Sequence, residues 1–380
     1  MLLVNSKSVM SELAKQFLSS LRPLAPKVER VASHLRSQIS GGVLMPGSRL
    51  PSWDDMARQF KVGRPTLMRA LEWLKTDGFI YSDSTRGTFV TERPPHLCRY
   101  GLVFTSGPGE QWWNRYWQAL AAEAARIERT QNSQVPLFYH VTSHADDETS
   151  ARLAREIRSH RLAGIICAGD SSLCDSPLWG EADVPPIVVL GPRPLSVAKS
   201  VALEVDRDSF VRRSLEWMQQ QGRKRIAILT EPTQTFPQYR TELTAFGMST
   251  KPQWFLMASA TAPQAAKNIV HLLLDRDEKN RPDGLIITDD NIVETALSGI
   301  VAAGIEVPNE LVVVGHCNWP WPVRSVVPIR RLGFDARMVL QEAIAAIDAM
   351  RDGQETPPLQ LIGATFEEEQ VEANSLMTIG

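Results

Sequence analysis

The chain has 380 residues and a formal net charge of −2. It contains no run of about 18 apolar residues, so a membrane-spanning helix is not expected, and its length predicts two or three domains. The four cysteines form no C-x-x-C pair and no histidine spacing suggests a zinc ligand set, which is typical of reduced thiols. The first residues lack a basic stretch and a cleavage pattern, so we expect a cytoplasmic protein.

The charge is distributed unevenly along the chain. Residues 24–95 carry 11 Lys and Arg against 7 Asp and Glu, whereas residues 96–380 carry 27 against 35. A basic head on an acidic body fits nucleic-acid binding by the head. Ordinary scatter of surface charge explains the same numbers, so charge alone leaves both interpretations open.

The first predicted elements are three helices within residues 24–93. Residues 27–40 carry an apolar stripe at helical spacing. A connector rich in Gly and Pro, "GVLMPGSRLPS", follows, and Ser52 is a suitable N-cap for the second helix. The turn "KVG" leads to the third helix, which holds Pro65 in its first turn, where proline is tolerated.

Two strand-like runs around the turn "DSTRG" complete the head as a β-hairpin. Helix, connector, helix, tight turn, helix and hairpin is the order of a winged helix-turn-helix domain, whose helix after the tight turn enters the major groove of DNA. Leu44 and Leu50 would fasten the connector to the core, so that the second helix packs across the first. The order of elements therefore predicts a DNA-binding head.

The head also resembles a known family. The segment "QISGGVLMPGSRLPSWDDMARQFKVGRPTLMRALEWLKTDGFI", continued by "RGTFV", is similar over about 65 residues to the DNA-binding domain of the GntR family of bacterial transcription regulators. The chain departs from that pattern at three positions. Asp54 stands where the family usually has an Arg, Gly63 replaces a Ser, and Met68 replaces an Arg of the recognition helix. The resemblance implies DNA binding, but not every base contact of the family carries over.

The predicted DNA contacts come from the connector, the recognition helix and the wing. A guanidinium fork fits O6 and N7 of guanine, so Arg64 is the candidate base contact. Arg86 at the wing tip is the candidate for the minor groove, whereas Arg49, Lys61 and Thr66 would touch phosphate. A solvated surface charge is the alternative for each of these cations. The full predicted set is Arg49, Ser52, Lys61, Arg64, Thr66, Arg69, Arg86, Gly87 and Thr88.

Beyond a short linker at residues 94–98, apolar strands alternate with amphipathic helices over residues 99–370. Such strands are "RYGLVFT", "LAGIICAG", "RKRIAILT", "PDGLIITD" and "ELVVVGH". Nearly continuous apolar strands between helices predict parallel sheets that are covered on both faces. Two successive rounds of this pattern predict two lobes, with a ligand cleft at the carboxyl ends of the strands.

The body resembles the periplasmic-binding-protein-like effector domain of the LacI family. The most similar segments are "VALEVDRDSFVRRSLEWMQQQGRKRIAIL" and "RPDGLIITDDNIVETALSGIVAAGIEVPNELVVVGHCN". A GntR-type head on a LacI-type body is the layout of the arabinose-repressor subgroup of GntR regulators. The resemblance implies a multidomain protein, with a winged helix-turn-helix head and an α/β body of two parallel-sheet lobes. Residues 1–23 are predicted to be a helical extension, and residues 371–380 a C-terminal tail.

The ends of the predicted strands supply the candidate effector-binding residues. They are Trp112, Trp113, Arg115, Asp170, Arg193, Asp290, Cys317 and Asn318. Arginines beside aspartates suit a ligand with hydroxyls and a carboxylate or phosphate. The tryptophans are equally compatible with interface or core packing, and Asp290 with a simple helix cap. The LacI-family pattern has an Asp at the position of Cys317, and members of that family use it to hold sugar hydroxyls. The absence of this Asp argues against a simple sugar as the effector.

The sequence carries no catalytic, metal or cofactor motif that we recognise, including G-x-S-x-G, a Walker loop and H-E-x-x-H. We therefore expect a transcription regulator and not an enzyme, most simply a repressor. It would bind near-palindromic operator DNA as a homodimer and respond to a small polar effector, with a sugar or sugar derivative possible. Two alternatives stay open: a body that only dimerises and has lost its ligand, and an α/β enzyme.

Overall fold

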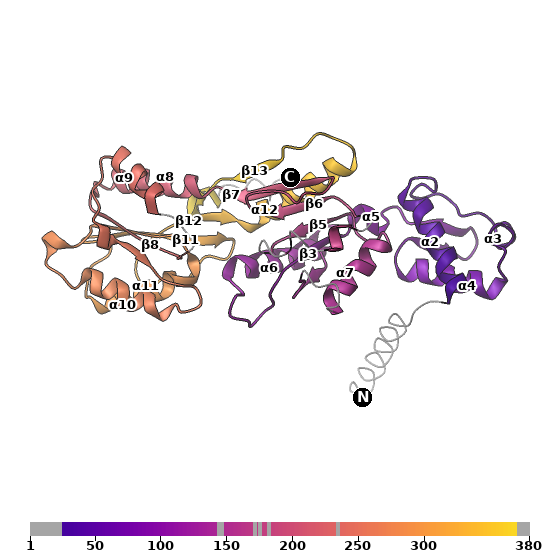
Figure 1. The fold of residues 1–380 in the computed structure, drawn as a ribbon, viewed down its shortest axis with the longest axis horizontal. Helices are drawn as coiled ribbons and strands as arrows, with labels where there is room; N and C mark the ends of the chain where they lie inside the picture. The colour runs from indigo at the N-terminus through magenta and orange to yellow at the C-terminus, as the bar shows by residue number, and fades with distance from the viewer. Residues whose placement is uncertain are drawn as a thin grey trace, which may run out of the picture. The chain divides into compact units, whose positions relative to one another are not determined.

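The computed structural model describes residues 25–142, 148–169, 173, 177–180, 184–232 and 236–370. The extension predicted at residues 1–23 and the tail predicted at residues 371–380 lie outside these described residues. The chain divides into two compact units, a head that ends at Cys98 and a body that begins at Arg99 (Figure 1). Residues 158–161 are the exception, because they are grouped with the head.

The head contains three main helices and a two-stranded antiparallel hairpin. Its elements are α2 (Pro26–Ser40), α3 (Trp53–Phe60), α4 (Arg64–Thr76), β1 (Ile80–Asp83), β2 (Gly87–Val90) and α5 (Pro95–Cys98). The predicted order of a winged helix-turn-helix is therefore confirmed. The residues expected to form a linker contain the short helix α5. Ser52 caps α3 as predicted, because its hydroxyl accepts a hydrogen bond from the Asp55 N–H at 3.2 Å.

The connector between α2 and α3 runs beside the wing. The Leu50 N–H donates to the Thr88 carbonyl at 2.9 Å, and the Val90 N–H donates to the Ser48 carbonyl at 2.9 Å. Leu50 is buried in the head core, and Leu44 is packed against that core. The connector is thus held by backbone hydrogen bonds and by apolar burial, which sets where α3 begins.

The first lobe of the body is built on a six-stranded parallel sheet in the order β13-β7-β6-β5-β3-β4. The strands are β3 (Tyr100–Val103), β4 (Leu137–Phe138), β5 (Gly164–Cys167), β6 (Ile187–Leu190), β7 (Ser200–Val205) and β13 (Leu359–Ile362). Apolar side chains of α6 (Arg115–Thr130) and α12 (Ala336–Arg351) cover one face. The other face packs on α7 (Glu148–Arg158) and on the 3-10 turn η2 (Pro177–Gly180). Burial on both faces explains the continuous apolar runs.

The second lobe has a six-stranded sheet in the order β14-β12-β11-β10-β8-β9. The strands are β8 (Ile226–Thr230), β9 (Phe255–Met257), β10 (Gly284–Ile287), β11 (Val312–Trp319), β12 (Arg330–Asp335) and β14 (Thr365–Phe366), and only β14 is antiparallel. Helices α8 (Arg207–Gln220) and α9 (Phe236–Ala245) pack on one face. Helices α10 (Gln264–Leu274) and α11 (Asp290–Ala302) pack on the other. The 3-10 turns η3 (Pro252–Trp254) and η4 (Glu278–Asn280) lie in its connections.

The register of the second sheet brings the ends of β8 and β10 to the same level. The last residue of β10, Ile287, lies opposite Leu229 of β8 and opposite Gly315 of β11. The residues that follow β8 and β10 therefore reach the same edge of the sheet, beside the last residues of the longer strand β11. Polar residues at such edges cap the next helix: the Asp289 carboxylate accepts the Asn291 N–H at 2.9 Å at the start of α11.

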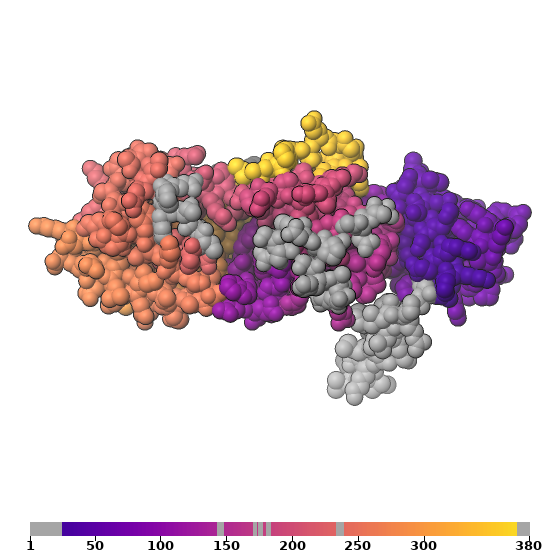
Figure 2. Space-filling view, in the orientation of Figure 1, coloured from indigo at the N-terminus to yellow at the C-terminus, as the bar shows by residue number. Residues whose placement is uncertain are grey.

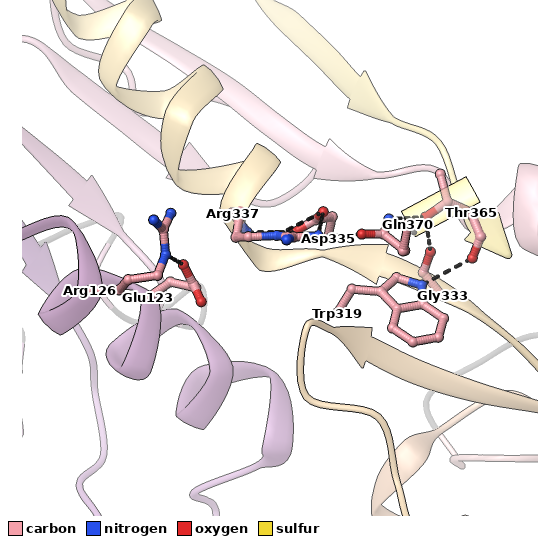
Figure 3. A network of polar contacts seen from close by, with 8 residues as sticks. All are labelled: Glu123, Arg126, Trp319, Gly333, Asp335, Arg337, Thr365 and Gln370. Carbon is pink, nitrogen blue, oxygen red and sulfur yellow. Dashed lines mark hydrogen bonds and ion pairs between the residues drawn. The ribbon is translucent and has the colours of Figure 1, made fainter. Parts of the chain in front are cut away.

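The chain passes between the lobes at three places: from β7 to α8, from β12 to α12, and from β13 to β14. In Figure 2 the yellow segment that carries β13 returns along the first lobe. At the β12–α12 passage, Asp335 caps α12 and its carboxylate pairs with the Arg337 guanidinium at 2.7 Å (Figure 3). Beside it, the Trp319 indole donates to the Thr365 carbonyl at 3.1 Å. This ion pair and this hydrogen bond stabilise the strand ends at the junction between the lobes.

Candidate nucleic-acid interface and ligand cleft

The recognition helix α4 separates an apolar face from a face open to solvent. Its buried side chains are Leu67, Ala70, Leu71 and Leu74. On the other side, the Arg64 guanidinium lies 5.8 Å from the centroid of the Trp53 ring, and Met68 is 57% exposed. An arginine and an apolar side chain at the helix start can read base edges, because guanine accepts from a guanidinium and thymine offers a methyl group.

Three of the predicted DNA contacts, Arg49, Arg86 and Gly87, lie at or beside the wing, which is the hairpin of β1 and β2. Arg86 stays exposed at the tip while its Nε donates to Asp83 at 3.1 Å. Hydrogen bonds from the backbone and side chain of Thr85 lower the pKa of Asp83. Gly87 has a φ of +110°, and a Cβ there would lie 3.0 Å from Nε of Arg49. The glycine therefore lets the Arg49 guanidinium lie against the wing.

The other predicted DNA contacts occupy different positions in the head. Lys61 and Arg69 are exposed, and Thr66 and Thr88 are half-buried. Lys61 ends α3 in a left-handed conformation with a φ of 51°. The Ser52 hydroxyl is engaged with Asp55, to whose carboxylate it donates at 2.6 Å. Its position supports the start of α3.

A cleft of about 530 Å³ opens between the two lobes of the body. Both lobes contribute: the first through the residues before and within α6, and the second through the ends of β8, β10 and β11. The lining combines aromatic rings with polar groups. The aromatic side chains are Trp112, Trp113, Tyr116, Phe210, Tyr239, His316 and Phe334. Aromatic rings together with convergent polar groups in a concavity are typical of small-molecule sites.

Four carboxylates line this cleft, and they come from three strand ends: Glu204, Glu231, Asp289 and Asp290. Arg207 is the one cation among the described lining residues. When all five groups are ionised, the lining therefore carries a formal charge of −3. This charge differs from the mixed arginine and aspartate site that the sequence predicts.

Asp290 is 2% exposed, and the amide of Asn318 donates to its carboxylate at 2.7 Å. Burial, and next the charge of Asp289, raise the pKa of Asp290 to about 7. Burial also raises the pKa of Asp289. Among the described residues, no lysine or arginine lies within ion-pair distance of either aspartate. The pair thus combines a buried and a half-buried carboxyl, and its hydrogen-bond donors among the described residues are neutral.

His316 lies beside this pair, with its Nδ1 3.9 Å from a carboxylate oxygen of Asp290. Its Nδ1 is buried and has no hydrogen-bond partner among the described residues. Burial, and next the charge of Arg207, lower the pKa of His316 to about 3. The imidazole is therefore neutral at physiological pH and adds no positive charge to the cleft.

The structure brings four predicted effector-binding residues together in the cleft: Trp112, Trp113, Asp290 and Asn318. The Trp113 ring is held edge-on against Phe104, with centroids 5.1 Å apart, whereas Trp112 is 68% exposed. A fixed ring beside an exposed one offers a flat apolar wall to a ligand.

The remaining predicted residues lie elsewhere. Arg115 joins the lobes at the edge of the cleft, since its N–H donates to Asn291 at 3.0 Å and its guanidinium lies 3.4 Å from Glu294. Arg193 is exposed and does not line the cleft. Cys317 is fully buried, because side chains alternate along β11 and its neighbours face the cleft. Asp170 lies outside the described residues.

Several lining residues were not predicted, among them Arg207, Tyr239, Asp289 and Glu231. Arg207 follows β7, whose sequence "SVALEV" was not recognised as a strand. Asp289 stands directly before Asp290 in "IITDD", and the strand-end rule that selected its neighbour applies to it as well. Glu231 follows "AILT" in the same way. A consistent application of that rule would have found two of the four, Asp289 and Glu231.

Other site types find no support in the part of the chain that the structure describes. There, no group of three or more His, Cys, Asp and Glu side chains is placed to hold a metal ion. None of the described helices is long and apolar enough to cross a membrane.

Two family models match the chain. The model of bacterial regulatory proteins of the gntR family matches residues 27–90, which form the head, and that of the periplasmic binding protein-like domain matches residues 216–366 of the body. A regulatory protein of the LacI family from Chloroflexus aggregans shares the body's fold, with a TM-score of 0.56 and 16% identity. That similarity covers 70% of this chain and 96% of the other.

Relatives align with nearly the whole chain. An arabinose metabolism transcriptional repressor of Geobacillus stearothermophilus is 22% identical over 368 residues, which cover 90% of this chain and 98% of the relative. A protein of the same description from Halalkalibacterium halodurans is 22% identical over 353 residues, covering 87% and 93%. These relatives are regulators and not enzymes. The protein therefore joins a GntR-family DNA-binding domain to a periplasmic-binding-protein-like body, and it is a homologue of transcriptional repressors.

Proposed function

We propose that this protein represses transcription by binding operator DNA through its head, and that a small polar effector bound between the lobes controls it. The repressor role is supported by the relatives that align over nearly its full length. One observation carries the effector role: Asp290 and Asn318, both buried and polar, line a cleft of about 530 Å³ to which both lobes contribute. Burying a carboxylate without a cationic partner is costly, so a merely structural body gains nothing from it.

In the proposed DNA complex, Arg64 contacts a guanine in the major groove and Arg86 enters the minor groove from the wing. Arg49, Lys61 and Thr66 contact phosphates, and the exposed Arg69 adds positive charge. Gly87 and Thr88 shape the wing, and Ser52 positions α3. Because the recognition helix is short and single in each head, a homodimer on a near-palindromic site would supply two such helices. Such a complex forms where the chromosome lies, which for a bacterial regulator is the cytoplasm.

The effector is proposed to be a sugar or a sugar-derived molecule, since the relatives control arabinose metabolism. It would be no larger than a typical drug molecule. It would lie against Trp112 and Trp113, with Asp290 and Asn318 as hydrogen-bond partners. Closing the lobes around it would change the arrangement of the two heads of the dimer. Such control requires only that the effector binds one arrangement more tightly than the other.

Titration of DNA with the full chain tests the DNA-binding part of this proposal. An operator duplex would be selected from a random library by binding to the wild-type chain. Arg64→Ala is expected to cost about 1–3 kcal/mol of specific binding and to relax the preference at one base pair. Arg129→Ala, which removes an exposed arginine of α6 in the body, serves as the control with the same loss of charge.

The outcomes separate the possible roles of the head and body. Equal losses on the selected duplex and on a scrambled duplex would show that Arg64 contacts phosphate only. A wild-type chain that selects no sequence from the library would refute the regulator role. A chain that binds its operator but no small molecule would support the alternative in which the body only dimerises.

A further inference from the structure

The charge of the cleft limits the chemistry of its ligand. With Asp290 ionised, four carboxylates face one guanidinium in the lining. An anionic ligand would add to this excess of negative charge in a partly desolvated site, where repulsion is weakly screened. The arginine that sequence analysis placed there, Arg193, is exposed and does not line the cleft. Among the described residues, the lining thus offers a carboxylate or phosphate only the single guanidinium of Arg207.

The two adjacent aspartates form the most negative part of the lining. Asp289 accepts hydrogen bonds from the backbone and the side chain of Asn291, at 2.9 and 2.7 Å, and Asp290 accepts one from Asn318 at 2.7 Å. All three donors are neutral. Two neighbouring carboxylates with only neutral donors are compensated either by a proton or by a bound cation.

Arg207 does not neutralise the two aspartates directly. It lines the cleft from the start of α8 and forms no ion pair with Asp289 or Asp290 among the described residues. The charge of Arg115 acts on both aspartates, and its guanidinium lies 3.4 Å from Glu294. No described arginine or lysine therefore forms an ion pair with the two aspartates, and a bound cation could take that place.

Aromatic rings and hydroxyl-binding groups complete the site. The faces of Trp112 and Trp113 suit a protonated nitrogen or the C–H face of a polyol. The amides of Asn291 and Asn318 and the hydroxyl of Thr261 can bond to ligand hydroxyls. A ligand that carries an ammonium group and several hydroxyls would match both the aromatic rings and the hydroxyl-binding groups of the lining.

We propose that the effector is a cationic, hydroxyl-bearing amine, such as an amino sugar, whose ammonium group lies against Asp289 and Asp290. This inference rests on the proposed function, because it names the ligand class of the same cleft. It narrows the proposed sugar or sugar-derived effector to one that carries a positive charge. The alternative, a protonated Asp290 that donates to a neutral sugar hydroxyl, is an outcome of the test.

Matched probes that differ only in charge provide the test. Three molecules share a carbon with three hydroxymethyl groups: Tris has an ammonium as the fourth substituent, pentaerythritol a hydroxymethyl, and 3-hydroxy-2,2-bis(hydroxymethyl)propanoate a carboxylate. A second set compares glucosamine, galactosamine and mannosamine with the parent hexoses and the uronic acids. Binding to the full chain would be measured by calorimetry in an amine-free buffer near pH 7, where the probe amines are protonated and Asp290, with a pKa of about 7, can ionise.

We expect at least one amine to bind about tenfold or more tightly than its neutral counterpart, since charge-assisted hydrogen bonds are about twice as strong as neutral ones. Asp289→Asn should remove most of that preference while preserving shape. Glu216→Gln, which removes an exposed carboxylate of α8 outside the cleft, should leave the preference unchanged.

Other results would overturn the proposal in distinguishable ways. Neutral or acidic probes that bind as tightly as the amines would refute the ligand class and leave the cleft as an effector site. An amine preference that survives in Asp289→Asn and in Asp290→Asn would place the cation elsewhere. If no probe of any charge binds, the effector role fails together with the ligand class, whereas operator binding by the head is measured independently.

Discussion

The carboxyl of Asp290 shows how one residue can combine structural and functional demands. It begins helix α11, where a carboxylate suits the helix dipole, yet it is buried beside the second carboxylate of Asp289. The neutral amide of Asn318 compensates only part of the cost of its charge. Such a residue is costly in the ligand-free protein, and the proposed cation would offset that cost.

The raised pKa of Asp290 predicts the pH dependence of stability. An aspartate in the unfolded chain titrates near 4, whereas burial raises the pKa of Asp290 to about 7 in the folded protein. The folded state binds the proton more tightly, so this group stabilises the protein fully below pH 4 and loses that contribution as the pH rises to 7. In the ligand-free protein, Asp290→Asn should therefore weaken the decline in stability between pH 5 and pH 8, by a few kcal/mol.

Thermal or denaturant unfolding of the body across that pH range would measure the effect. Asp275→Asn is a suitable control, because Asp275 is exposed at the end of α10 and should leave the pH profile unchanged. If the free energy of unfolding changes with pH in the same way for the wild-type chain and for Asp290→Asn, Asp290 is ionised in the folded protein throughout the range.

At the scale of elements, helices α10 and α11 make a close contact that depends on Gly299. A Cβ at this position would lie 2.4 Å from the backbone carbonyl oxygen of Lys267 and 3.0 Å from Cβ of Val270. Backbone atoms of α10 cannot move aside as a flexible side chain would. Glycine therefore sets the distance between two helices that cover the same face of the second sheet, and α11 carries Asp290 at its start.

Gly299→Ala is expected to destabilise the body. Overpacking costs about 1–3 kcal/mol, which exceeds the roughly 1 kcal/mol that alanine gains over glycine in a helix interior. Urea unfolding would measure the change. Gly363→Ala is the matched control, because the nearest atom to a Cβ there lies 4.0 Å away. A more stable Gly299→Ala variant would show that the helices can separate at no cost.

At the scale of the whole molecule, the proposed regulation requires that the cleft and the head influence each other. If an effector weakens operator binding by some factor, the operator must weaken effector binding by the same factor, because both describe one free-energy cycle. Typical coupling energies of about 1–3 kcal/mol correspond to factors of about 5–150. We expect a factor in this range for the probe that binds most tightly in the cleft.

Two titrations would measure this coupling: effector binding with and without saturating operator, and operator binding with and without saturating effector. Arg64→Ala should weaken operator binding and leave the coupling factor unchanged, since it alters the head only. Effector binding that leaves operator affinity unchanged would mean that the cleft does not control this regulator.

Local patterns in the sequence were sufficient for the head and for the sheet architecture. The apolar stripe of residues 27–40, the cap at Ser52 and the turn before Pro65 each depend on interactions within a few residues, so they could be predicted in order. The apolar strands of the body likewise revealed parallel sheets, because burial on both faces leaves no alternation. Strands without that signature, such as β7, were missed.

The set of residues that line the cleft depends on contacts between segments far apart in the chain, so local sequence patterns could not predict it. Whether a residue at a strand end faces the cleft is set by strand order and by alternation along the strand, which excludes Cys317 and includes His316 next to it. Arg193 and Arg207 have the same chemistry in the sequence, and only the passage of the chain from one lobe to the other puts Arg207 in the lining. The net charge of the cleft is a sum over both lobes, and short-range patterns carry no information about such a sum. Residue types and local periodicity thus indicate a DNA-binding head and a two-lobed body, whereas the chemistry of the ligand follows from how distant strand ends come together.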